Sequence, residues 1–167
     1  IERSIAPLIE QGLVEVRRNQ FYLEIELKSA FLFTSGSASF SVDAQTILGL
    51  IAEVLATQPN RIHIEGYTDN IPVTSEVYPS NWELAAARAS AVTRLFASKG
   101  VAPDRMAAIS YGENKPAADN DSEAGRARNR RVVVVVLNEL TENTGLSETA
   151  AYSVMESLLK LSPFWVD

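Results

Sequence analysis

The chain has 167 residues with a formal net charge of −6, 46% hydrophobic residues, 22% charged residues and no cysteine. This composition supports one folded domain with terminal extensions and excludes an intrinsically disordered chain. The acidic balance argues against a nucleic acid as partner, and the lack of cysteine excludes a disulfide framework and a thiolate metal site.

The first half of the chain alternates between strand and helix patterns. In chain order, the expected elements are a helix end at residues 1–11, a hairpin of strands at 13–18 and 21–27, a loop of small polar residues at 33–39, a helix at 42–57 and a strand at 61–67. The last strand places Ile62 and Ile64 on one face and His63 on the other. We interpret this lone histidine as a structural or surface residue rather than a ligand-binding one.

The second half continues the same alternation. The expected elements are a polar loop at 68–79, a helix at 81–99 capped by Ser80 and ended by Gly100, a strand at 104–111, a polar loop at 112–127, a strand at 131–137 and a helix beginning at Ser147. The β-branched run 131–137 is typical of a strand covered on both faces. The order of elements predicts an α/β (α+β) two-layer sandwich, with a mixed sheet, both long helices on one face and additional terminal helices.

Arg88 is the most unusual residue in these patterns, because it interrupts the apolar stripe of the 81–99 helix. It lies four residues after Leu84 and four before Val92. An arginine buried without a partner costs several kcal/mol, and its fork of donors suits a carboxylate. Two interpretations stay open: Arg88 is held by a carboxylate of the protein or of a ligand, or it extends along its stem to the solvent.

Asp69 is the predicted partner of Arg88. The 61–67 strand leads into Thr68 and Asp69 at its C-terminal end, where ligands collect in α/β sheets. The same loop leads to the Arg88 helix, so we expect the two side chains to pair. Such a pair would keep acceptors for an ammonium and donors for a carboxylate, which predicts a receptor for an amino-acid-like zwitterion.

Several separated motifs carry a resemblance to a known family. They are, in order, FTSGSA, HIEGYTDN, SNWEL within NWELAAARA, SYGENKPAADN and ARNRRVVVVVL. Over roughly residues 20–138 the chain resembles the OmpA-like peptidoglycan-binding domain, and most of all its flagellar stator branch, the MotB family with MotB, MotD and PomB. It departs from the family pattern at Ala85, where serine is usual, and in a loop between Asp69 and Arg88 that is longer than in outer-membrane members.

The resemblance implies a set of ligand-binding residues but no catalytic residue, metal or cofactor. Asp69 and Arg88 would grip the diaminopimelate of the peptide stem. The whole implied set is Asp69, Arg88, Thr34, Asn81, Leu84 and Arg131, the last near the glycan. For Arg131, a salt bridge at the strand edge is an equal alternative.

The resemblance also implies a non-catalytic periplasmic module that anchors a flagellar stator to the cell wall. Residues 1–12 would end a periplasmic linker, 13–140 would form the domain and 141–167 a helical extension. The implied partners are peptidoglycan, a second copy in a homodimer and a MotA-like membrane subunit, with flagellar P- and T-ring proteins as further candidates. Because the chain begins with Ile1 and has neither a signal peptide nor a run of about 18 apolar residues, we expect a soluble piece whose inner-membrane helix precedes it.

Two other functions are considered. The wall-binding domain of an outer-membrane OmpA-type protein or lipoprotein would use the same site and differ in its membrane segment. A wall hydrolase using Glu65, Asp69 or Glu113 would need two carboxyl groups held across a scissile bond. Nothing in the sequence provides a second carboxylate that converges on Asp69, so we expect no enzyme.

Overall fold

The structure, a computed structural model, describes residues 6–138, apart from the side chains of residues 6 and 7. The elements are α1 (Ala6–Glu10), β1 (Val14–Arg18), β2 (Tyr22–Lys28), α2 (Ser29–Leu32), α3 (Val42–Ala56), β3 (Ile62–Tyr67), α4 (Asn81–Ser98), the 3₁₀ turn η1 (Pro103–Arg105), β4 (Met106–Gly112), α5 (Glu123–Asn129) and β5 (Arg131–Leu137). No helix within this described part has the length and apolar character needed to span a bilayer. The predicted helix at Ser147 and the whole 141–167 extension lie outside the described residues.

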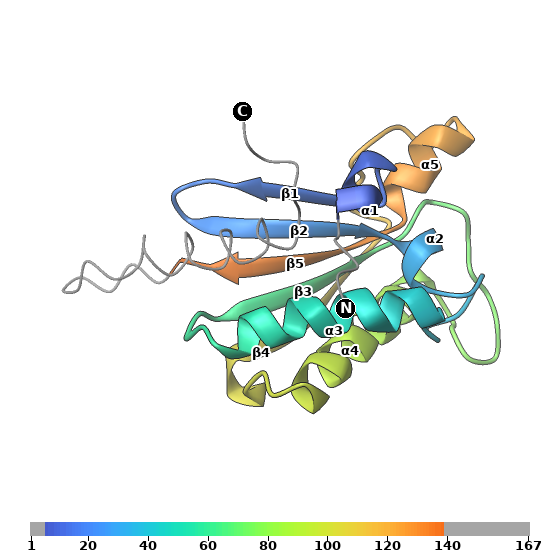
Figure 1. Ribbon diagram of the computed structural model, residues 1–167. Helices are drawn as coiled ribbons and strands as arrows, with labels where there is room; N and C mark the ends of the chain where they lie inside the picture. The colour runs from blue at the N-terminus through green and yellow to red at the C-terminus, as the bar shows by residue number, and fades with distance from the viewer. Residues whose placement is uncertain (1–5, 139–167) are drawn as a thin grey trace.

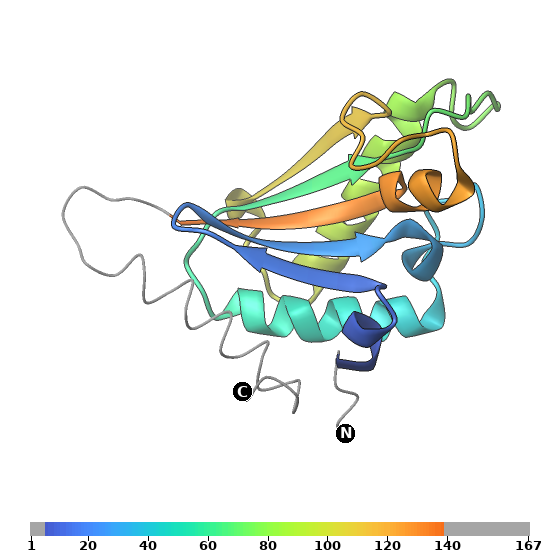
Figure 2. The same ribbon diagram turned by 90° about the horizontal axis from the view of Figure 1, so that it is seen from above.

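The strands form one mixed sheet in the order β1-β2-β5-β3-β4. β3 and β4 run parallel, and the other neighbours pair antiparallel. Figures 1 and 2 show α3 and α4 together on one face of this sheet. The predicted two-layer α+β arrangement is therefore confirmed.

β5 lies at the centre of the sheet, and both of its faces are buried as its sequence predicts. Val132, Val134 and Val136 point to the helices and join the main core, where Phe96 of α4 is fully buried. On the second face, Val133 and Val135 pack with Tyr67 and other sheet side chains. The second face is thus covered by the sheet's own long side chains.

Two short helices were not predicted. Residues 112–127 were expected to form a loop, but α5 begins at Glu123, after a cap in which the Ser122 hydroxyl accepts from the Gly125 N–H. α2 likewise follows β2 directly. Neither segment is long enough to show a helical apolar repeat, so periodicity could not reveal them.

Glu26 is the centre of a charge network on the second face of the sheet. Its carboxylate accepts hydrogen bonds from Arg17 Nη2 and from Lys28 Nζ, both at 2.8 Å. Burial alone would raise the pKa of Glu26, but these two hydrogen bonds outweigh burial and hold the pKa below its ordinary value of 4.5. The ionised carboxylate is therefore the form that the fold favours.

We expect Glu26→Gln to flatten the acid limb of the stability curve. A depressed pKa in the folded state means that ionised Glu26 stabilises the fold fully above about pH 4.5, and that this contribution is lost as the pH falls through the lowered pKa. Thermal unfolding followed from about pH 7 to about pH 3 should show a smaller loss for Glu26→Gln than for wild type. Glu53→Gln, at an exposed position of α3, serves as the control and should follow wild type. Parallel curves for wild type and Glu26→Gln would contradict this linkage.

Candidate ligand-binding site

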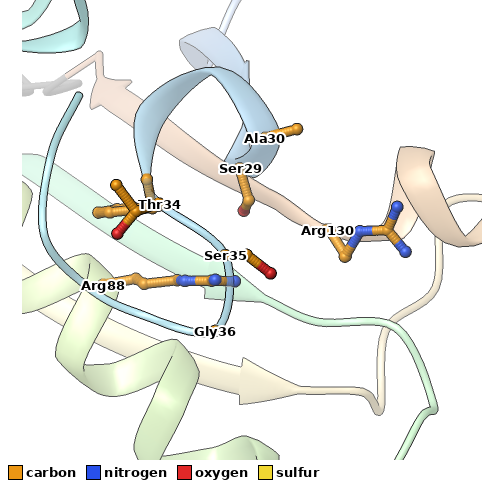
Figure 3. Close-up of a pocket in the computed structure, with 8 residues that line it drawn as sticks. Ser29, Ala30, Thr34, Ser35, Gly36, Arg88 and Arg130 are labelled. Carbon is orange, nitrogen blue, oxygen red and sulfur yellow. The ribbon is translucent and has the colours of Figure 1, made fainter. Parts of the chain in front are cut away.

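The predicted site residues come mainly from segments that meet at one end of the sheet. α2, α5 and the loop after β3 all lie at this end (Figure 1). A cavity of about 410 Å³ is found here. It is lined by Ser29, Ala30, Phe33, Thr34, Ser35, Gly36, Arg88 and Arg130 (Figure 3).

Gly66 allows β3 and α4 to lie in direct contact below this cavity. A Cβ atom at Gly66 would be only 2.2 Å from the carbonyl oxygen of Ala85. Only a glycine fits such a close approach of strand and helix backbones. The contact brings the loop that carries Asp69 and the helix that carries Arg88 to the same end of the sheet.

Arg88 is buried, with 6% of its surface exposed, so the interpretation that it extends to the solvent is wrong. Its Nε donates to the Ser37 carbonyl oxygen at 3.0 Å, and its Cζ lies 5.1 Å from the centroid of the Phe33 ring. No carboxylate among residues 6–138 forms an ion pair with it. Burial lowers the pKa of Arg88, against the opposing influence of Tyr78 and Asp69, yet an arginine remains a cation at neutral pH.

Asp69 pairs with Arg130, not with Arg88. Its Oδ2 accepts from Arg130 Nη1 at 2.7 Å, and its Oδ1 accepts from the Ile71 N–H at 3.0 Å. The direct Asp69–Arg88 pair predicted from the sequence is therefore wrong, although the Asp69 charge still acts on Arg88 through space. Hydrogen bonds to Asp69 and Glu123 outweigh the effect of burial and raise the pKa of Arg130.

Arg130 is thus the site residue that sequence reasoning missed, and its neighbour Arg131 lies elsewhere. Arg131 is on the second face of the sheet, with its Cζ 3.8 Å from the Tyr67 ring centroid and its Nε 4.0 Å from Glu26. These contacts match the salt-bridge alternative, and Arg131 does not line the cavity. The sequence signal that could have identified Arg130 is the pair of consecutive arginines at the start of a strand. Neighbouring side chains there point to opposite faces, so the two arginines cannot both lie on the second face of the sheet.

The three remaining predicted residues have different positions. Thr34 lines the cavity, and its hydroxyl donates to Ser37 Oγ at 3.0 Å. Asn81 is buried and donates through Nδ2 to the carbonyl oxygens of Asp69 at 3.3 Å and Ile71 at 3.1 Å, so it fastens the Asp69 loop to α4. Leu84 is buried on α4 without lining the cavity.

Hydrogen bonds to the Asn120 side chain fix the segments that carry Asp69 and Arg130 relative to each other. Asn120 Oδ1 accepts from the Asn70 N–H at 3.2 Å and from Asn129 Nδ2 at 2.9 Å. Asn70 follows Asp69, and the fully buried Asn129 precedes Arg130. Asn120 therefore connects the two segments that carry the ion pair without lining the cavity itself.

This arrangement is suited to binding an ion rather than to proton-transfer chemistry. The cavity is lined by Arg88, whose guanidinium has no ion-pair partner among residues 6–138, and by Arg130; Asp69 does not line the cavity itself but pairs with Arg130 at its edge. A bound carboxylate would supply the missing negative charge, and Asp69 has acceptor positions left for an ammonium. Within the described part of the chain, no group of three or more histidine and acidic side chains is placed to hold a metal ion.

Comparison with known proteins identifies the family. Residues 32–130, which include Asp69, Arg88 and Arg130, match the model of the OmpA family. YtxE of Bacillus subtilis (strain 168) is 40% identical over 129 residues, which are 77% of this chain and 53% of that protein. Motility protein B of Helicobacter pylori (strain J99) is 33% identical over 136 residues, 80% of this chain and 49% of that protein. The chain thus spans about half the length of these curated relatives.

Solved structures of other proteins also resemble this chain. The cell wall anchor of the T6SS from Pseudomonas aeruginosa superposes with a TM-score of 0.75 at 34% identity, over 81% of this chain and 94% of that one. The periplasmic domain of Helicobacter pylori MotB gives a TM-score of 0.71 at 25% identity, over 99% of this chain and 98% of that one. The sequence, the sheet order and these likenesses agree, and the chain belongs to the OmpA family.

Proposed function

We propose that this domain binds peptidoglycan without catalysis and anchors a flagellar stator to the cell wall. The observation that carries the proposal is Arg88, a buried guanidinium with no ion-pair partner among residues 6–138. A buried charge of this kind is costly unless something neutralises it, and a ligand carboxylate would do so. Membership of the OmpA family supports a non-catalytic domain.

The diaminopimelate of the peptide stem has the complementary chemistry, because its free end carries both a carboxylate and an ammonium. In our proposal the carboxylate binds Arg88, and the ammonium binds the acceptor positions of Asp69 that Arg130 and the Ile71 N–H leave open. Thr34 lines the same cavity, whereas Asn81 and Leu84 support it from α4. A contact of Arg131 with the glycan remains a prediction.

The likeness to motility protein B favours a stator over an outer-membrane protein or lipoprotein. In this proposal residues 13–140 form the wall-binding domain, 1–12 end a periplasmic linker and 141–167 form an extension. A transmembrane helix ahead of the chain would hold it in the inner membrane beside a MotA-like subunit. A homodimer would bind the repeating wall polymer with greater avidity than one domain.

Co-sedimentation with purified sacculi tests the proposal. The chain should pellet with sacculi whose stems contain diaminopimelate and should stay in the supernatant with sacculi whose stems contain lysine, since lysine lacks the carboxylate. Failure to pellet with either wall would contradict wall binding. Equal pelleting with both would contradict recognition of diaminopimelate.

Asn120→Ala should weaken this binding by about 1–2 kcal/mol, because two hydrogen bonds that align Asp69 with Arg130 are lost. Asn120→Asp should bind nearly as wild type, because both bonds are donated to Oδ1 and a carboxylate oxygen accepts them equally well. The measurement is the fraction pelleted over a titration of sacculi.

Asn114→Ala is the matched control for Asn120→Ala. Asn114 is exposed, and its amide donates only to the Tyr111 carbonyl oxygen. It should leave wall binding unchanged. Equal losses in Asn120→Ala and Asn120→Asp would show that Asn120 does not act through these two accepted hydrogen bonds.

A further inference from the structure

We infer that the cavity distinguishes a charged from a neutral form of its ligand: it accepts a peptide stem in which the carboxyl group at the side-chain end of diaminopimelate is free and rejects the same stem when that group is a carboxamide. The inference rests on the proposed function and adds which chemical form of the wall is bound. It follows from the hydrogen-bonding capacity and the charge around Arg88.

Arg88 offers hydrogen-bond donors and no acceptor. A guanidinium has five N–H groups, and in Arg88 the Nε–H donates to the Ser37 carbonyl oxygen. Within residues 6–138 no acceptor forms a hydrogen bond with the four Nη–H groups. A carboxylate meets such a fork with two acceptor oxygens, whereas a carboxamide presents one oxygen and an NH₂ group that would face other donors.

The charges of the site also favour a carboxylate over a carboxamide. Arg130 already has two carboxylates, Asp69 at 2.7 Å and Glu123 at 2.5 Å. Among residues 6–138 Arg88 has none, so within this part of the chain the positive charge of the cavity that lacks an ion-pair partner belongs to Arg88. A neutral carboxamide would leave that charge buried, and an ionised carboxylate would neutralise it.

The surroundings of Arg88 strengthen this discrimination. The Phe33 ring covers one side of the guanidinium, with 5.1 Å between Cζ and the ring centroid, and only 6% of the residue is exposed. A buried charge is screened less than a surface charge, so the difference between a charged and a neutral ligand is larger here than at the surface. The side chain of Arg130 is 28% exposed and is screened more strongly.

Three synthetic stem tripeptides test the inference by isothermal titration calorimetry on the whole 167-residue chain. The first ends in diaminopimelate with a free carboxyl group at its side-chain end, the second has a carboxamide at that position, and the third ends in lysine, which has no carboxyl group there. The free acid should bind at least about tenfold more tightly than the other two, which corresponds to about 1.4 kcal/mol. A carboxamide that binds within about twofold of the free acid would overturn the inference, while the proposed wall binding would stand.

Arg88→Gln identifies the residue responsible. In this variant the affinity for the free acid should fall to that of the carboxamide in wild type, or below it. Arg94→Gln, at an exposed position of the same helix, should keep the wild-type preference. A preference of about tenfold that survives in Arg88→Gln would assign the selection to another group and overturn the inference. Absence of binding for all three tripeptides, together with no co-sedimentation on sacculi, would instead remove the proposed function.

Discussion

Arg88→Ala should weaken binding to purified sacculi by ~2–5 kcal/mol, a factor of roughly 30 to 5,000. The size of the effect follows from burial: without the guanidinium, a ligand carboxylate would lose part of its hydration in the cavity and find no Arg88 cation to replace it. The depletion of soluble protein over a titration of sacculi measures this loss. Asp69→Asn should act in the same direction, because it removes the charge that an ammonium would meet.

The same substitution should have little effect on folding. Arg88 contributes a hydrogen bond to the Ser37 carbonyl oxygen, worth about 1 kcal/mol, and its removal also relieves a buried charge that has no ion-pair partner among residues 6–138. Thermal unfolding of Arg88→Ala should therefore stay close to that of wild type. Arg94→Ala controls for the loss of an arginine from the same helix. Wild-type binding by Arg88→Ala would show that the ligand is held elsewhere.

The long elements could be predicted from the sequence because each shows a strong period. The β-branched run 131–137 coincides with β5, and the apolar repeats in α3 and α4 locate both helices within one or two residues. α5 lacks such a repeat and is held by contacts with the loop that precedes it. Its Gly125 packs so closely that a Cβ would lie 2.0 Å from the Asp119 carbonyl oxygen. A segment held by contacts of this kind shows no period that a sequence pattern can reveal.

The candidate site could be predicted from the sequence only in part. Helical spacing placed Arg88 within the apolar face of its helix, because spacing determines which face a residue occupies, but left open whether its guanidinium extends to the solvent. The partner of Asp69 was not predictable, since it depends on which of two consecutive arginines faces the end of β3. Arg130 has an extended backbone at the end of α5, and Arg131 is the first residue of β5. The sequence shows that these two arginines have opposite directions at the start of a strand, but not which of them reaches Asp69.

Gly66→Ala should lower the free energy of unfolding by about 3 kcal/mol or more. The new Cβ would lie 2.2 Å from the Ala85 carbonyl oxygen, which belongs to the backbone of α4 and cannot move without moving the helix. Separation of α4 from β3 would also displace Arg88 from Asp69, so wall binding should weaken together with stability. Urea unfolding followed by circular dichroism measures the first effect, and co-sedimentation measures the second.

Gly49→Ala provides the comparison, because the same chemical change should there have the opposite sign. Gly49 lies inside α3, and a Cβ would meet only the flexible end of Lys99, with Cε at 3.5 Å. Alanine in a helix interior is favoured over glycine by up to about 1 kcal/mol, so this variant should be as stable as wild type or more stable. If both variants unfold at the same urea concentration, the close contact between β3 and α4 does not limit stability, and Gly66 has no special role in bringing the Asp69 loop and Arg88 to the same end of the sheet.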